Sequence, residues 1–142
     1  METQELHRGR LIDHIQLVVR DLPASQRFYE AIFKVLGIPV VGAAGDYFYA
    51  DELFVSTAES EAAQGQLTGR HHLAFQAADP AMVDAFHAAA LGAGGRDNGA
   101  PGERPYHPGY YAAFVLDPDG NNIEAVFHGP AQRSAPSVKI TF

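Results

Sequence analysis

A strand is predicted over residues 11–19, where apolar and polar residues alternate along the chain. Successive side chains of a strand point to opposite faces, so Ile15, Leu17 and Val19 share one face, which we expect to be core. His14 and Gln16 lie on the other face. Because these two side chains are polar, we expect the second face to line a cavity.

A helix is predicted directly after this strand. Asp21 can accept hydrogen bonds from the free amides of a helix start, and Pro23 suits the first turn. Apolar residues then recur at helical spacing and form a stripe that covers the sheet: Phe28, Ile32, Val35 and Leu36. Gly37 favours a left-handed cap that ends the helix. Short strands are predicted next, around residues 39–42, 47–50 and 53–57, before a polar linker over residues 59–69.

The same order of elements begins again near Arg70, so the chain contains an internal repeat. His72 falls on His14 at an offset of 58 residues (72 − 14), and a second helix starts at Asp79-Pro80. Two further strands are predicted over 110–116 and 122–127, joined by a tight turn at 117–120. Residues 99–109 hold three prolines and three glycines, and we expect them to form a loop that covers a site. A repeat too long for a solenoid unit indicates two copies of one module that face each other.

These elements predict one domain over residues 1–142. Module one spans about residues 11–58, module two spans about residues 70–128, and residues 129–142 form a C-terminal tail. We expect residues 1–10 to be frayed because they are polar. The tail ends in Val138-Lys139-Ile140-Thr141-Phe142, which we expect to add an edge strand or to reach a partner subunit.

The charge and composition of the chain argue against several classes of partner. Its net charge is −7 with only ten Lys and Arg residues, so we expect no nucleic-acid surface. No apolar run approaches the roughly 18 residues of a membrane span, and the first residues lack the pattern of a signal peptide. The chain has no cysteine and therefore neither a disulfide nor a thiolate metal site. We expect a cytoplasmic protein that binds a small molecule.

Three side chains on the polar faces of the predicted strands point to a metal site: His14, His72 and Glu124. The two histidines occupy equivalent places in the repeat, and Glu124 lies opposite the apolar face of its strand. A lone strand histidine more often packs in a core, and a lone strand glutamate often faces water. The register of the histidine pair favours the ligand interpretation. Imidazole and carboxylate suit one divalent ion of Fe, Mn, Ni, Co or Zn, and three protein ligands leave positions open for substrate.

The sequence resembles the vicinal oxygen chelate superfamily, which includes glyoxalases, bleomycin-resistance proteins and extradiol dioxygenases. The likeness covers roughly residues 11–128 and rests on Ile12-Asp13-His14-Ile15, on Phe28-Tyr29, on His72-Leu73-Ala74-Phe75 and most specifically on Asp117-Pro118-Asp119-Gly120-Asn121-Asn122-Ile123-Glu124. The resemblance implies an α+β fold in which two βαβββ modules form a cup-shaped, glyoxalase-like mixed sheet with helices on its outer face. It also implies a divalent metal in the cup, a homodimer, and His14, His72 and Glu124 at the ligand positions.

The chain departs from one branch of that family. Lactoylglutathione lyases usually take a fourth ligand from the last strand of the first module, where this chain offers Phe54 or Val55 instead of a carboxylate. The departure favours the members that use three ligands, such as dioxygenases, thiol transferases and assorted lyases or isomerases.

Further polar residues lie near the predicted covering loop. In addition to Glu124, we expect Tyr111 and His107 to act in catalysis, because a phenol or an imidazole near a metal can donate a proton or orient a substrate. Tyr106 and Tyr110 lie in the same region, and aromatic packing explains the tyrosines equally well. Arg104 is a candidate for contact with an anionic substrate, and a solvated loop arginine is an equal alternative.

We therefore expect a metal-dependent enzyme of the glyoxalase/dioxygenase type, which chelates vicinal oxygens of a small substrate and acts as a lyase, isomerase or dioxygenase. The alternative is a metal-free module that binds a small molecule or an antibiotic, as resistance proteins do. A third possibility is a structural or regulatory dimer with a vestigial cavity. Metal content separates the first function from the other two, whereas stabilisation by a drug without metal favours the second.

Overall fold

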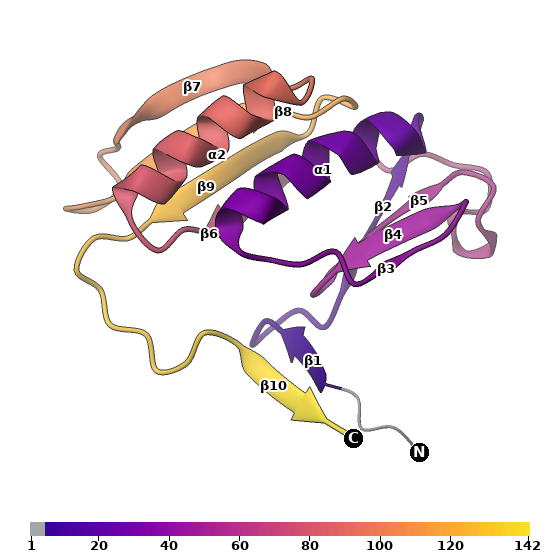
Figure 1. Cartoon of the computed structure of the whole chain (residues 1–142), viewed down its shortest axis with the longest axis horizontal. Coiled ribbons are helices and arrows are strands. Elements are labelled where there is room, and N and C mark those ends of the chain that lie inside the picture. The colour runs from indigo at the N-terminus through magenta and orange to yellow at the C-terminus, as the bar shows by residue number, and fades with distance from the viewer. Residues whose placement is uncertain (1–4) are drawn as a thin grey trace.

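The computed structural model describes residues 5–142 and contains two modules with the same order of elements (Figure 1). Module one contains β2 (Ile15–Val19), α1 (Leu22–Leu36), β3 (Gly42–Ala43), β4 (Tyr47–Ala50) and β5 (Leu53–Thr57). After a short 3-10 helix (Glu61–Ala63), module two contains β6 (His72–Gln76), α2 (Pro80–Gly92), β7 (Arg96–Glu103), β8 (Tyr111–Leu116) and β9 (Asn122–Phe127). The prediction of an α+β fold with two βαβββ modules is confirmed.

Each module folds its four strands into one mixed sheet, and the two sheets share a topology. The strand order is β2-β5-β4-β3 in module one and β6-β9-β8-β7 in module two. In each sheet the first strand of the module runs parallel to the last, and the other neighbours are antiparallel. His14 directly precedes β2 and His72 begins β6, so the repeat places the two histidines at corresponding positions.

Both helices begin as their sequences predict. The Asp21 carboxylate accepts a hydrogen bond from the Ala24 amide at 3.1 Å, and the Asp79 carboxylate accepts one from the Met82 amide at 2.8 Å. These bonds satisfy amides that a helix start leaves free. Gly37 ends α1 with a φ of 76°, which a residue with a side chain rarely adopts. Within residues 5–142, no helix combines the length and the apolar character that crossing a membrane requires.

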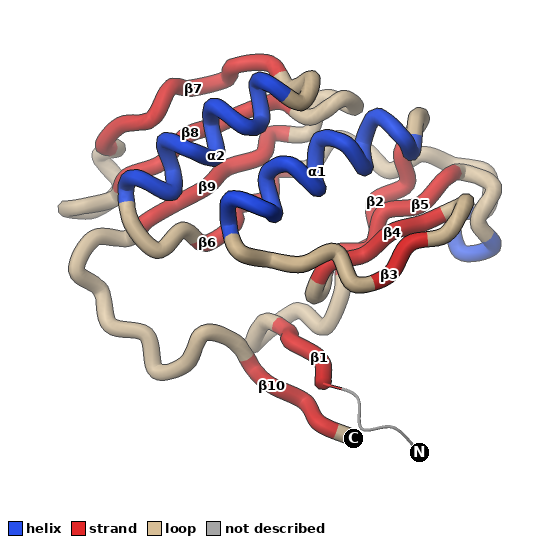
Figure 2. The backbone as a smooth tube through the Cα atoms, in the orientation of Figure 1, coloured by secondary structure: helices blue, strands red, loops and turns tan. Residues whose placement is uncertain are grey.

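One apolar core joins the two modules through their helices. α1 and α2 pack against each other, and Figure 2 shows them side by side with the strands of each module around them. The Phe33 ring of α1 lies 5.2 Å from the Phe75 ring of β6. A Cβ at Gly95 would stand only 2.7 Å from Phe28 Cε2, so this glycine allows α1 to approach module two. Because the helices lie at the junction, each sheet keeps one face that no helix covers, called the open face below.

Residues 99–109 differ from their prediction as a loop. Residues 99–103 belong to β7, which is the edge strand of its sheet. An edge strand tolerates a proline such as Pro101 because one side of its backbone needs no strand partner. The pairing of β7 with β8 shifts register on both sides of Gly99, as β-bulges do. The connecting loop is therefore limited to residues 104–110.

The two ends of the described chain pair with each other. β1 (Glu5–Arg8) pairs antiparallel with β10 (Val138–Thr141), so the expectation of a frayed start is wrong for residues 5–8. The expectation for residues 1–4 lies outside the described residues. The C-terminal tail does add a strand, but it pairs with β1 and with neither four-stranded sheet. This two-stranded ribbon stands apart from the modules in Figure 1.

Candidate metal centre

His72 and Glu124 meet on the open face of module two. In the parallel pairing of β6 with β9, Ala74 lies opposite Glu124, two residues along from His72. His72 Nε2 lies 3.0 Å from Glu124 Oε1. The Glu124 side chain is 3% exposed and the His72 side chain is 50% exposed. An accessible imidazole therefore stands beside a buried carboxylate.

The other polar atoms of this pair are also held in place. His72 Nδ1 lies 3.0 Å from the carbonyl oxygen of Asn122, which can only accept, so Nδ1 is assigned as the donor. The Tyr110 hydroxyl donates a hydrogen bond to Glu124 Oε2. Metal-binding histidines and carboxylates have outer partners of this kind, which fix the ring and the carboxylate. His72 Nε2 and Glu124 Oε1 are the two atoms of the pair that would remain to hold a cation.

Tyr110 is held in its protonated form. Burial raises the pKa of its phenol to about 12, and the hydrogen bond to Glu124 and the charge of Glu124 act in the same direction. The positive charge of Arg104 acts in the opposite direction and is the smallest of these effects. At neutral pH Tyr110 therefore donates its proton to the Glu124 carboxylate in a hydrogen bond.

The tyrosine beside Glu124 is Tyr110, whereas the sequence analysis selected Tyr111. The Tyr111 hydroxyl donates to Asp84 Oδ1 of α2 at 2.7 Å, so it points to the helix side of the sheet. The signal that separates the two lies in the hairpin after β8. Its tight turn pairs Phe114 with Glu124. The even-numbered residues of β8, and Tyr110 just before it, therefore share the face of Glu124, whereas Tyr111 lies on the opposite face.

His107 lies in the loop beside Tyr110 without contacting Glu124. Its Nε2 is 2.9 Å from Nδ1 of His128, and its ring centroid is 5.2 Å from that of Tyr110. Tyr106 also packs edge-on against Tyr110, with its ring centroid 5.0 Å from that of Tyr110. Both rings pack edge-on against Tyr110, so His107 contacts the site through Tyr110.

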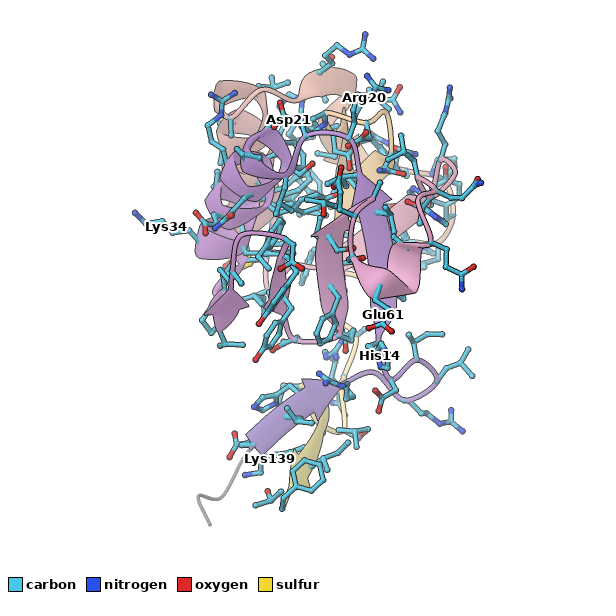
Figure 3. The ribbon with its side chains drawn as sticks, turned by 90° about the vertical axis from the view of Figure 1, so that its right-hand side faces the viewer. His14, Arg20, Asp21, Lys34, Glu61 and Lys139 are labelled. Atoms are coloured by element: carbon cyan, nitrogen blue, oxygen red, sulfur yellow. The ribbon has the colours of Figure 1, made fainter. Side chains whose placement is uncertain are left out.

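The structure does not bring His14 to His72 and Glu124. His14 Nδ1 lies 2.7 Å from Asp13 Oδ1, and the hydrogen bond between them lowers the pKa of the Asp13 carboxyl. Figure 3 shows His14 at the end of module one nearest the β1–β10 ribbon. Among residues 5–142, no three His, Asp or Glu side chains form a group that could hold a metal ion. One chain therefore gathers two of the three predicted ligands.

The turn after β8 fixes the position of His72. Asp117 is 2% exposed, and its carboxylate accepts a hydrogen bond from the Tyr29 hydroxyl at 2.5 Å and one from the Asn121 amide at 2.8 Å. Asn121 Oδ1 in turn accepts a hydrogen bond from the His71 amide at 2.8 Å. Since His71 precedes His72, the turn ties α1 to the start of β6. Residues 117–124, the most specific part of the family likeness, thus include the turn that holds the start of β6 in position.

Module one carries a row of aromatic rings on its open face. The ring centroids of Tyr47 and Tyr49 are 6.4 Å apart, those of Tyr49 and Phe54 are 4.7 Å apart, and both pairs stack. His14 meets Phe54 edge-on at 5.5 Å. Phe48 alternates with the tyrosines and is fully buried in the core, so the row points away from the core. Phe54 stands where a fourth ligand was considered, and its ring supplies packing surface instead.

A cavity of about 400 Å³ lies at the start of β6. Its lining includes His72 together with the amide side chains of Asn98 and Asn122. A depression of about 530 Å³ also runs along α1 from Pro23 to Lys34, but no histidine lines it. We associate the chemistry with the smaller cavity, because it contains a candidate ligand.

The family model of the Glyoxalase/Bleomycin resistance protein/Dioxygenase superfamily matches residues 11–125, which is most of the 142-residue chain. The chain belongs to this superfamily. A search of curated proteins finds no match.

Solved structures of the superfamily share the fold. A glyoxalase/bleomycin resistance protein from Albidiferax ferrireducens T118 is 32% identical, with a TM-score of 0.67, over 82% of this chain and 97% of that one. A glyoxalase/bleomycin resistance protein/dioxygenase family enzyme from Burkholderia phytofirmans PsJN is 24% identical, with a TM-score of 0.65, over 80% and 95% of the two chains. A lactoylglutathione lyase from Agrobacterium tumefaciens is 22% identical, with a TM-score of 0.58, over 81% and 91%. The last two likenesses show the fold alone.

Proposed function

We propose that this member of the superfamily is a metal-dependent small-molecule enzyme of the glyoxalase/dioxygenase type. The observation that carries the proposal is the His72–Glu124 pair, in which Nε2 and Oε1 face each other at 3.0 Å while Asn122 and Tyr110 hold the outer atoms. This donor set fits a divalent ion of Fe, Mn, Ni, Co or Zn. When bound, such an ion polarises the oxygens of a substrate that it chelates. A lyase, isomerase or dioxygenase reaction on vicinal oxygens is consistent with that role.

The protein's own residues orient this chemistry. The Asn122 carbonyl holds the His72 ring so that Nε2 faces the site, and Tyr110 keeps Glu124 from rotating. Tyr110 also places a protonated phenol within reach of the same carboxylate. The burial of Glu124 strengthens its interaction with any cation, because little water screens the charge.

We further propose that the enzyme is a homodimer in which His14 of a second copy completes each site. Three observations support this arrangement. His14 and His72 occupy corresponding positions in the two modules, His14 stands apart from His72 and Glu124 in one chain, and both open faces lack a helix. If the open face of module one meets that of module two from another copy, the aromatic row beside His14 becomes an apolar wall opposite Glu124. Such a site suits a substrate with an apolar body.

The test is metal content in single and mixed variants. We expect about one metal ion per wild-type chain, and its loss in His14→Ala and in Glu124→Ala. In a purified heterodimer of these two variants, one site carries both substitutions and the other carries none, so about one metal ion per two chains should return. His87→Ala is the control, because His87 lies in α2 and bonds to Asp97 of β7 instead of to His72 or Glu124.

The outcomes separate the candidate functions. No recovery of metal in the heterodimer, with full loss in each parent, would mean that each site lies within one chain. Failure of the wild-type protein to take up any of these ions would refute the enzyme proposal. In that case, thermal stabilisation by a small molecule without metal would support a binding module.

A further inference from the structure

We propose that Arg104 binds an oxyanion group of the substrate, a carboxylate or a phosphate, on the open face that carries His72 and Glu124. The substrate would then be an anionic molecule that presents vicinal oxygens to the metal and its charged group to Arg104. This inference rests on the proposed function, since it names the class of substrate for the same site.

The Arg104 guanidinium lies over the open face of module two. Its central carbon is 5.3 Å from the centroid of the Phe114 ring. Phe114 lies directly opposite Glu124 in the pairing of β8 with β9, and its ring stacks on that of His72 at 6.0 Å. The neighbours of Phe114 in β8, Ala113 and Val115, belong to the core on the other side. Arg104, Phe114 and His72 therefore form a continuous stack beside Glu124.

Two glycines of β7 make room for this arginine. A Cβ at Gly102 would stand 3.1 Å from Arg104 Nη1, and a Cβ at Gly99 would stand 3.3 Å from Nη2 and 2.9 Å from Phe114 Cδ2. The strand shifts register at the same two glycines. Two backbone carbonyls then hold the guanidinium, with Nη2 donating to Ala100 O at 2.6 Å and Nη1 donating to Glu103 O at 3.3 Å. The side chain is fixed before any ligand arrives, which lowers the entropy cost of binding.

The charge of Arg104 is not balanced by a carboxylate. In residues 5–142, no carboxylate oxygen lies within 4.0 Å of its nitrogens, although the chain as a whole carries a net charge of −7. The two carbonyls use only part of the five N–H donors of a guanidinium. The remaining donors and the charge match the geometry of carboxylate and phosphate groups. A solvated loop arginine, the other interpretation of the sequence, does not have these contacts.

The test compares ligands that differ only in an anionic group. Catechol and 3,4-dihydroxybenzoate share vicinal hydroxyls, and only the second carries a carboxylate. Dihydroxyacetone and dihydroxyacetone phosphate form the corresponding phosphate pair. Dissociation constants would be measured by calorimetry on the metal-loaded protein, for the wild type, Arg104→Gln, Arg104→Lys and His72→Ala. Arg96→Gln is the matched control, because Arg96 is an exposed arginine at the other end of β7.

We expect the wild type to bind the charged member of at least one pair about tenfold more tightly, as one charge-assisted hydrogen bond would give. Arg104→Gln should lose this preference, so that the charged and the neutral member bind with similar affinity, and Arg104→Lys should keep part of it. Added salt should weaken the preference. The pair that shows it distinguishes carboxylate from phosphate.

Other outcomes overturn the proposal or its basis. If the neutral members bind in a manner that requires His72 but the charged members bind no better, the Arg104 proposal is wrong and the metal site stands. A preference that survives in Arg104→Gln, or that is lost equally in Arg96→Gln, also refutes it. If none of the four ligands binds the loaded protein, both this proposal and the proposed function lose their support.

Discussion

Replacing Tyr110 with phenylalanine removes the hydroxyl that holds Glu124 and leaves the ring in place. Tyr111→Phe is a matched control one residue along the chain, since its hydroxyl bonds to Asp84 on the opposite side of the sheet. Both substitutions delete one oxygen atom and one hydrogen bond to a carboxylate. They differ in the burial of that carboxylate, because Glu124 is 2% exposed and Asp84 is exposed. A difference between the variants therefore reports on the site.

The structure sets the expected size of the effect. In the metal-free protein, Tyr110→Phe leaves Glu124 Oε2 buried without this donor, at a cost of about 1.5–3 kcal/mol in the free energy of unfolding. The remaining partner, His72, is half exposed, so solvent screens its contribution. Tyr111→Phe should cost about 1 kcal/mol or less, because water can replace its hydroxyl at Asp84. In the metal-loaded protein, loss of an outer partner of a ligand should weaken metal affinity about 10- to 100-fold.

Two measurements check these values. Urea unfolding of the metal-free variants gives the change in the free energy of unfolding, and competition with a chelator gives the metal affinity. Alkaline pH offers a third measurement. The pKa of Tyr110 is raised from 10.0 to about 12 in the folded protein, so its contribution to stability is present below pH 10 and is lost as the pH rises from 10 towards 12. Stability should fall less steeply over this range in Tyr110→Phe than in the wild type.

The reasoning is refuted if Tyr110→Phe and Tyr111→Phe have the same metal affinity and the same stability. That result would mean that Glu124 needs no fixed orientation. A loss of stability without a change in metal affinity would restrict the role of Tyr110 to the metal-free protein.

Two further substitutions test how the fold supports the site. Tyr29→Phe should lower the free energy of unfolding by about 1.5–3 kcal/mol, because it removes a donor from the buried Asp117 carboxylate. Urea unfolding checks this value, with Tyr106→Phe as the control because Tyr106 is 67% exposed. Gly95→Ala should cost about 1–3 kcal/mol, because its Cβ would stand 2.5 Å from Val115 Cγ1. Gly45→Ala is its control, with no atom within 4 Å of the added Cβ, and an equal loss in both glycine variants would contradict the packing argument.

The sequence by itself determined the modules and their elements. Alternation predicted β2 and the aspartate caps predicted both helix starts, because these signals depend only on residues near one another in the chain. Strands were also predicted close to the observed β4, β5, β8 and β9. The repeat predicted that His14 and His72 occupy corresponding positions, and the structure places them so. The side of the sheet that Glu124 faces also follows from its own strand.

The tertiary structure decided what these elements bring together. β1 pairs with β10 across almost the whole chain, and β7 forms from glycine- and proline-rich residues because bulges and an edge position accommodate them. Tyr110 lies in the loop over residues 104–110, so the sequence did not show whether Tyr110 or Tyr111 shares the face of Glu124. The pairing of β8 with β9 settles this question. The packing of α1 on α2 decides how the modules sit, and it leaves His14 apart from His72 and Glu124. Local signals specify which face of a strand a side chain occupies, whereas the distance between two faces depends on contacts between residues far apart in sequence.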